Sequence, residues 1–545
     1  MMEKTIQFFE SRGKKRLKKE DHDCRWYADF IEFQKQEKIF ATLMTPPPYG
    51  GSDARWDTWR NSEFSEILGF YGLNYWYTWQ VSMLGLGPIW MSKNEAVKKK
   101  TAELLDQGAI FGFGLSEKEH GADLYSSEMK LYPVPGEGYQ ARGRKYYIGN
   151  GNQAALVSTF GKMSFNDEFV FFAVQSQHPN YKCIQNVVHS QNFVAEFELK
   201  NYPIQDADIL SQGTEAWDAS LNTINICKFN LGWASIGICT HAFYEAISHA
   251  ASRNLYGQMV TDFPHVQHLF VDAYARLVAM KLFSKRAIDY MRSASAQDRR
   301  YLLYNPMVKM KVTTQGEEVI NLLWDVIAAK GFEKNMVFET ATRDIRALPK
   351  LEGTVHVNMA LIIKFMKNYF FQPDEFPEIP TRDDATHDEF LFDQGPTKGL
   401  GQIRFHDYMK AYQSMDLPNV KILRDQIQAF KRLLLVAGPT AEQKKDFGFL
   451  LILGELFTIV AYGQLILEQA KLTSVDPELV DQIFDFLVRD FSKFALQLLT
   501  HTQSTRAQVV MAGLLIRKPK KNEARFQRIW QNDVLSLKDA YSMKN

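Results

Sequence analysis

The sequence is poor in cysteine and almost free of net charge. Four cysteines occur in 545 residues, at positions 24, 183, 227 and 239, and no two of them form a C-x-x-C pair. This spacing argues against a zinc site or a disulfide framework, so we expect a reducing compartment, the cytoplasm. The 64 basic and 63 acidic residues give a net charge of +1, which indicates neither nucleic acid nor an anionic membrane as a partner.

The sequence also shows no secretory signal. The basic run at residues 14–19 is followed by acidic residues rather than by an apolar core. At 545 residues the chain is too long for one ordinary core, and we expect two to four domains.

Hydrophobic periodicity divides the chain into a mainly α protein with a central β domain. Helical spacing predicts an N-terminal helical domain over 1–108, with a loop at the Pro- and Gly-rich residues 46–51. A period of two predicts a β domain over 109–213, and long helices follow over 214–372. A polar stretch at 373–402 is typical of a linker, and a C-terminal helical extension is expected over 403–545.

One apolar run, residues 449–467, is long enough to raise the alternative of a transmembrane span. It contains Glu455 and Gln464 and lies among charged amphipathic segments. These polar residues favour a buried helix of a soluble domain, with peripheral membrane contact as the less favoured alternative.

The stretch from Arg343 to Asn358 carries the candidate catalytic group. Glu352 stands after a loop marked by Pro349 and before an apolar run that predicts a helix. Gly353 allows a close backbone approach, while Thr354 and His356 add hydrogen-bonding groups. Two interpretations stay open at this point: Glu352 belongs to the cap of the helix, or it projects its carboxylate into a cleft.

Several motifs in a fixed order resemble those of the acyl-CoA dehydrogenase family. Arg343-Asp344 followed by Glu352-Gly353-Thr354 resembles that family's R-D then E-G-T, and residues 113–123 resemble its Y-x-V-T-E-P-G-A-G-S-D loop. Residues 144–151 resemble K-x-W-I-T-N-G. The resemblance covers roughly residues 25–370. It implies that the middle β domain is barrel-like and that 214–372 form a four-helix-bundle catalytic domain.

The resemblance implies FAD as the cofactor, with the two loops along the flavin edge. Residues of the loops that match flavin-contacting positions are Phe113, Leu115, Ser116, Gly121, Ala122, Tyr147, Ile148 and Gly149. Gly149 replaces a threonine, so one side-chain contact is expected to be missing. As an alternative, Asn150-Gly151 is a strong hairpin turn signal.

Further positions match the residues that hold the rest of the cofactor. Arg253 and Tyr256 resemble the R-x-x-F-G motif, whose arginine reaches the flavin pyrophosphate across a subunit interface, and Gln267 is a looser match. Asp325, Ala328 and Ala329 stand in a Q-x-x-G-G-x-G-F motif; Asp325 would repel phosphate unless Lys330 or Arg343 offsets it. Thr354 and His356 complete the set. A homodimer or homotetramer is therefore implied.

The substrate implied by the resemblance is an acyl thioester on CoA or on an acyl carrier protein. Matching positions are Ala122, Asn225, Lys228, Leu351, Glu352 and Gly353. Asn225 and Lys228 are a weakened form of D-x-x-R, because lysine lacks the bidentate fork of arginine. Glu352 would be the base, and its backbone N–H would bind the thioester carbonyl. Cys227 offers no carboxylate for that role.

The function implied is α,β-dehydrogenation of acyl-CoA to trans-2-enoyl-CoA in fatty acid metabolism, with an electron-transfer flavoprotein or O₂ as acceptor. No metal is implied. The E-x-x-H-G spacing at Glu117 to Gly121 leans towards acyl-CoA oxidases as an alternative. A non-catalytic scaffold of the same fold is a further alternative, which Gly149, Asp325, Ala328 and Ala329 permit.

Overall fold

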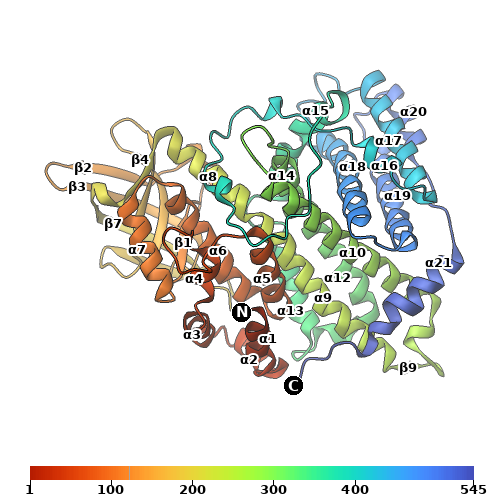
Figure 1. Cartoon of the computed structure of the whole chain (residues 1–545), viewed down its shortest axis with the longest axis horizontal. Helices are drawn as coiled ribbons and strands as arrows, with labels where there is room; N and C mark the ends of the chain where they lie inside the picture. The colour runs from red at the N-terminus through yellow and green to blue at the C-terminus, as the bar shows by residue number, and fades with distance from the viewer. Residues whose placement is uncertain (122, 545) are drawn as a thin grey trace. The chain divides into compact units, whose positions relative to one another are not determined.

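The structure is a computed structural model that describes residues 1–121 and 123–544. It is mostly helical with one central mixed β-sheet, which confirms the predicted class at that level (Figure 1). The chain divides into two compact units. The N-terminal unit comprises residues 1–230, residues 384–398 and the end of the chain from Met543; the C-terminal unit comprises 231–383 and 399–542.

The N-terminal unit begins with seven α-helices: α1 (Met2–Glu10), α2 (Lys14–His22), α3 (Ala28–Gln36), α4 (Ile39–Met44), α5 (Thr58–Tyr71), α6 (Leu73–Met91) and α7 (Glu95–Asp106). Nearly every side chain of α6 is buried, and this helix packs against the first strand and against α8 (Gly213–Cys227). Asp57 and Asn94 cap α5 and α7 by accepting backbone N–H groups. The predicted loop at 46–51 lies between α4 and α5.

The sheet consists of β1 (Phe111–Gly114), β2 (Lys130–Val134), β3 (Gly138–Gly149), β4 (Leu156–Met163), β5 (Phe169–Val174), β6 (Tyr181–Asn186), β7 (Val194–Ile204) and β8 (Ile209–Gln212). The strand order is β6-β7-β3-β2-β4-β5-β8, and β1 pairs with β4. The pairs β1–β4 and β2–β4 are parallel and the others antiparallel. A buried apolar cluster built from Leu131, Ile148 and Phe197, among others, holds the sheet in place.

Part of the predicted linker packs into the N-terminal unit. His387 Nδ1 accepts the backbone N–H of Trp56 at 3.1 Å, and Asp388 accepts that of Thr58 at 2.6 Å. The Phe392 ring lies edge-on to Trp56, with centroids 5.1 Å apart. Residues 384–398 are therefore held in place in this unit by hydrogen bonds and aromatic contacts.

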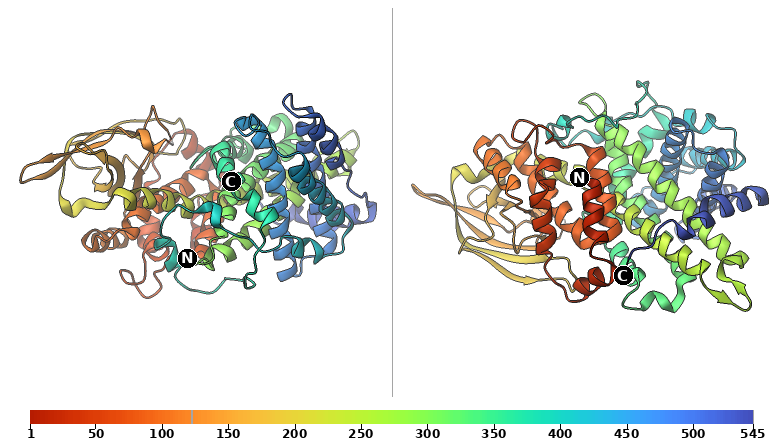
Figure 2. Two further views of the ribbon diagram at one scale, coloured as in Figure 1. Left: turned by 90° about the horizontal axis from the view of Figure 1, so that it is seen from above. Right: turned by 60° about the horizontal axis from the view of Figure 1, so that its bottom comes forward.

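The C-terminal unit is built from long helices. Its elements are α9 (Phe229–Ala251), the hairpin β9 (Asn254–Leu255) and β10 (Gln258–Met259), α10 (Pro264–Arg292), α11 (Tyr301–Met307), a π-helical turn (Val308–Val312), α12 (Thr313–Ile327), α13 (Val337–Ala347), α14 (Val355–Ile362), α15 (Met366–Phe371), α16 (Met409–Gln413), α17 (Pro418–Val436), α18 (Phe447–Leu472), α19 (Pro477–Thr500), α20 (Arg506–Leu515) and α21 (Glu523–Arg528). In Figures 1 and 2 the green and blue helices run side by side, and α10 contacts α12, α18 and α19. The extension therefore shares a core with the helices before residue 372. The predicted domain boundaries stay predictions.

Among the described residues, α18 is the one helix long and apolar enough to cross a membrane, with a mean hydropathy of 2.0 over its most apolar window. Protein covers 78% of that window. Gln464 accepts the hydroxyl of Tyr369, and Glu468 lies 2.9 Å from Arg286 Nε. The burial of α18 agrees with the predicted buried helix.

Candidate functional site

The two motifs predicted to share one cofactor edge lie side by side in the N-terminal unit. The backbone N–H of Tyr146 donates to Ser116 O at 3.0 Å, and Ser116 Oγ donates to Tyr146 O at 2.8 Å. Leu115 and Ser116 follow directly on β1, whereas Tyr146 belongs to β3. These reciprocal bonds hold the first loop against the strand that carries the second motif.

A buried ion pair reinforces this junction. Lys145 is fully buried, and its Nζ lies 2.7 Å from Glu117 Oε1 and 2.9 Å from Leu115 O. Burial lowers the pKa of Lys145 to about 8. Burial alone would raise the pKa of Glu117, but the charge and hydrogen bond of Lys145, with donors from Glu128 N and Ser127 Oγ, hold it below its ordinary value.

Neither Lys145 nor Glu117 was predicted to be a site residue, although both stand inside the two motifs. Strand alternation does not reveal the burial of Lys145, because the register of β3 shifts between Lys145 and Ile148, and Lys145 is buried whereas Tyr147 is exposed. Glu117, His120 and Glu128 also bring three ligand-type atoms within 4.8 Å of one another. Because Glu117 already forms an ion pair with Lys145, we interpret this cluster as an ion-pair network.

The end of β3 departs from the family pattern for a packing reason. A Cβ on Gly149 would lie 2.5 Å from Val81 Cγ1 and 2.8 Å from Tyr77 Cε1, so α6 fills the space that a threonine would need. Ile148 is buried in the sheet core. Tyr147 has a φ of 66° and its side chain is 42% exposed, which leaves an aromatic surface available to a planar ring.

Asn150 is a structural residue rather than a hairpin residue. Its fully buried amide donates to Phe111 O at 2.9 Å and accepts Thr78 Oγ1 at 2.9 Å, which ties α6, β1 and β3 together. The next strand, β4, does not pair with β3, whose partners are β2 and β7. The alternative of a two-residue hairpin at Asn150-Gly151 is therefore wrong.

The remaining predicted residues of the first loop have different surroundings. Phe113 is buried, with its ring 5.9 Å from that of Phe171. Gly121 has a φ of 53° and forms a bridge with Glu117, and the space where a Cβ would stand is open. Ala122, predicted to contact both flavin and substrate, lies outside the described residues.

The predicted substrate positions on α8 face the protein interior. Asn225 Nδ2 donates to Gln394 Oε1 at 3.3 Å, and both side chains are buried. Lys228, the C-cap of α8, is buried as well. This placement gives them packing roles in the N-terminal unit, and their contact with the nucleotide end of a thioester stays a prediction.

The two motifs predicted to hold the diphosphate both lie in the C-terminal unit. Burial lowers the pKa of His249, and the charges of Arg253 and Lys330 lower it further, so both cations act on the same imidazole. Arg253 directly precedes the β9–β10 hairpin, whose tip residue Tyr256 is 95% exposed. Gln267 instead donates to Thr261 O of its own chain at 3.0 Å.

Ala328, which follows α12, has a backbone conformation that is usually adopted by glycine. Ala328 has φ 57° and ψ −144°, a conformation that residues with a Cβ avoid. Asp325 and Ala329 are exposed nearby in sequence, and Lys330 pairs with Glu333 at 3.0 Å. The charge of Lys330 is thus balanced by Glu333, three residues further along the chain.

The candidate base occupies a left-handed loop between α13 and α14. Glu352 has a φ of 50° and Gly353 a φ of 85°, and Glu352 Oε2 is shielded from solvent. The N-cap of α14 is Thr354, whose Oγ1 accepts the N–H of Val357 at 3.4 Å. Thr354, the good capping residue of the cap interpretation, is therefore the N-cap, while Glu352 lies two residues before it; the role of Glu352 as base stays a prediction.

The neighbours of this loop differ in exposure. Leu351 is half-buried, while His356 is exposed and its ring lies 6.1 Å from that of Phe447. The guanidinium of Arg343 lies 3.1 Å from the buried carboxylate of Asp344. Lys309, which was not predicted to be a site residue, donates hydrogen bonds to two carbonyls of this loop.

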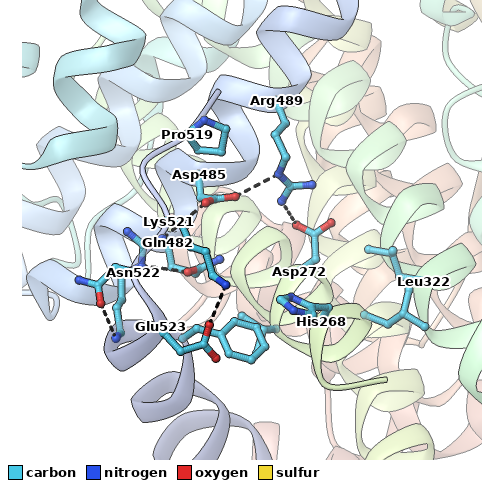
Figure 3. Close-up of a pocket in the computed structure, with 14 residues that line it drawn as sticks. His268, Asp272, Leu322, Gln482, Asp485, Arg489, Pro519, Lys521, Asn522 and Glu523 are labelled. Carbon is cyan, nitrogen blue, oxygen red and sulfur yellow. Dashed lines mark hydrogen bonds and ion pairs between the residues drawn. The ribbon is translucent and has the colours of Figure 1, made fainter. Parts of the chain in front are cut away.

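A separate cavity of about 350 Å³ lies in the C-terminal unit, lined by α10, α19 and residues 519–526 (Figure 3). Arg489 bridges Asp272 at 2.7 Å and Asp485 at 3.0 Å there. Of the described site residues predicted from sequence, none lines this cavity. Its charged groups pair with one another, so it is not the predicted site.

The chain is similar in sequence to acyl-CoA dehydrogenases. The family described as the C-terminal domain of acyl-CoA dehydrogenases matches residues 215–367. The very long-chain specific acyl-CoA dehydrogenase of Rattus norvegicus mitochondria is 22% identical over 313 residues, which are 54% of this chain and 46% of that protein. The 3-(aryl)acrylate reductase of Clostridium sporogenes is 21% identical over 63% of this chain and 91% of that protein. The chain thus spans about half the length of the rat relative.

Solved structures share the fold. An acyl-CoA dehydrogenase from Bacillus anthracis complexed with FAD has a TM-score of 0.77 and 15% identity, covering 98% of this chain and 95% of that one. Butyryl-CoA dehydrogenase of Megasphaera elsdenii has a TM-score of 0.57 and 18% identity over 66% of this chain and 96% of that one. These structures show that the chain has the acyl-CoA dehydrogenase fold, and residues 215–367 are similar to the C-terminal domain of that family.

Proposed function

We propose that this chain is an FAD-dependent acyl-CoA dehydrogenase that converts an acyl thioester to the trans-2-enoyl thioester. The observation that carries the proposal is the loop of Glu352: a carboxylate with a shielded oxygen, on a left-handed backbone, that does not serve as the helix cap. A structural glutamate needs no such backbone, whereas a base must be held in one direction.

The residues present fit FAD with two departures. Ser116 and the half-exposed Tyr147 lie on adjoining segments that would line the flavin edge, next to Ile148 and Gly149. The exposed Arg253 and the glycine-type backbone at Ala328 suit a diphosphate, the first by charge and the second by allowing close approach. The departures are Gly149, whose missing contact follows from the packing of α6, and Asp325, which is exposed.

When bound, FAD supplies a hydride acceptor. The chain's own part is proton transfer and positioning. Glu352 would take the proton from the α-carbon of the thioester, and its backbone N–H would donate to the thioester carbonyl. The half-buried Leu351 would help to exclude water next to the base.

The same proposal extends to partners. We expect acyl-CoA or an acyl carrier protein thioester as substrate, an electron-transfer flavoprotein or O₂ as acceptor, and a homodimer or homotetramer in the cytoplasm. The exposed Arg253 and Tyr256 support assembly, because a cation and a large aromatic residue at a hairpin are suited to a second subunit.

The test is to mix the purified, FAD-reconstituted chain anaerobically with acyl-CoA thioesters of increasing chain length. The absorbance of the oxidised flavin is then measured over time. We expect about one FAD per chain and bleaching by at least one thioester. Rapid reoxidation by O₂ would assign an oxidase. A protein that binds no flavin after reconstitution would be a scaffold, and the proposal would be wrong.

A further inference from the structure

The buried ammonium group of Lys309 contacts the loop of Glu352. Lys309 lies in the π-helical turn Val308–Val312, and its side chain is 0% exposed. Its Nζ donates to Pro349 O at 2.7 Å and also to Gly353 O. A buried ammonium is unfavourable unless hydrogen bonds replace its water, and these two carbonyls are such partners.

The two carbonyls stand on either side of Lys350, Leu351 and Glu352. One cation therefore holds both ends of the short segment that carries the candidate base. The segment needs such support, because Glu352 and Gly353 have consecutive positive φ angles of 50° and 85°, a backbone that a glutamate does not favour. Asn358 adds a second support by donating to Gly353 O at 3.0 Å.

The π-helical turn sends its two lysines to different partners. Lys311, two residues on and also buried, lies 3.6 Å from Glu455 of α18, and its Nζ is 5.7 Å from the Phe494 ring centroid. Of these two lysines, Lys309 is the one that hydrogen-bonds to the loop of Glu352. Single π-helical turns within α-helices are often found at functional sites.

We propose that Lys309 is a positioning residue for Glu352. By holding the carbonyls of Pro349 and Gly353, it fixes the direction of the Glu352 carboxylate and of its backbone N–H, without itself contacting substrate. This inference rests on the proposed function for its catalytic meaning. Its structural part, that Lys309 orders residues 349–353, is independent of any substrate.

The test compares Lys309→Met with the matched control Lys311→Met, both in the full-length FAD-bound protein. Methionine keeps the length of the stem but cannot donate to the carbonyls. We expect Lys309→Met to reduce the rate of flavin bleaching at saturating acyl-CoA by ~10–10²-fold, the order expected when a reacting group is misplaced. The dissociation constant of the thioester, from spectral titration, should stay nearly unchanged, and Lys311→Met should bleach at close to the wild-type rate.

Hydrogen exchange provides a readout that does not depend on activity. Amides of residues 350–354 should exchange faster in Lys309→Met than in Lys311→Met. If Lys309→Met does not fold, Lys309→Gln, which can still donate to one carbonyl, carries the same comparison with a smaller loss. Equal exchange and equal bleaching in the lysine 309 variant and its control would overturn the proposal. A wild-type protein that no thioester bleaches would refute the proposed function, while the exchange comparison would still decide whether Lys309 orders the loop.

Discussion

The Nζ of Lys145 lies 2.7 Å from Glu117 Oε1, both side chains are buried, and this pair joins the two segments that would line the flavin. Lysine and glutamate stand 28 positions apart in sequence, one in β3 and one in the loop after β1. The two segments are therefore held together by a buried ion pair as well as by hydrogen bonds between Ser116 and Tyr146.

Breaking this pair should be costly. Lys145→Met leaves the Glu117 carboxylate buried without its counter-charge, and we expect a loss of about 3–5 kcal/mol in the free energy of unfolding. Urea denaturation measures it. The exposed pair Lys93–Glu215, at 2.6 Å, offers a control, since Lys93→Met should change stability by less than about 1 kcal/mol. Equal small effects would contradict a structural role for the buried pair.

Glu352→Gln tests the base directly. Because the amide is nearly isosteric, the variant should keep its fold, its FAD and its thioester affinity. Flavin bleaching should slow by ~10²–10⁴-fold, the loss typical of a missing general base. Glu317→Gln is a suitable control, since Glu317 pairs with Lys350 of the same loop at 2.5 Å without entering it. Bleaching at the wild-type rate in Glu352→Gln would exclude Glu352 as the base.

Ala328→Gly should stabilise the protein. Relief of the backbone at φ 57° and ψ −144° is worth about 1–3 kcal/mol, and the greater freedom of glycine in the unfolded chain takes back about 0.4–1 kcal/mol. A higher Tm by calorimetry would show the net gain. Ala329→Gly, at an exposed neighbour outside the positive-φ region, should lower Tm slightly. If both variants lowered Tm, the strain at Ala328 would be refuted.

Acid stability should depend on Glu468. Burial would raise the pKa of this carboxyl, but the hydrogen bond of His406 and the charge of Arg286 outweigh it and lower the pKa to about 2. Because the folded pKa lies below that of the unfolded chain, the contribution is present above about pH 4.5 and is lost as pH falls towards 2. It amounts to about 3 kcal/mol. Unfolding free energies measured from pH 6 to pH 2 should fall less steeply in Glu468→Gln than in wild type.

We expect Arg253 to contribute both to FAD binding and to subunit assembly. If its guanidinium reaches the diphosphate of FAD on a second subunit, Arg253→Ala should weaken FAD binding and shift the protein towards monomer together. Sedimentation with absorbance at the flavin band measures both. A monomeric wild-type protein with a full complement of FAD would rule out the shared site.

The sequence was sufficient for the order of helical and β regions, because long amphipathic periods and the period of two are local signals. It predicted a helical N-terminal domain without separating α1 from α2, and residues 14–22 are too charged to show an apolar stripe. It also missed Lys145 and Lys309, which look like surface lysines until partners 28 and 40 or more residues away enclose them. Gly149 was recognised as a departure, but its cause, the side chains of Tyr77 and Val81, appears only in the folded packing.

The return of residues 384–398 to the N-terminal unit affects how the chain acquires its structure during synthesis. The surface around Trp56 lacks Phe392, and Thr58 lacks the acceptor Asp388, until the intervening 231–383 have been translated. At about 5–20 residues per second, that delay is roughly 8–30 s. Throughout this interval the nascent N-terminal unit presents an unfinished aromatic surface, so completion of its packing is tied to translation of residues 231–383 rather than to its own first 230 residues.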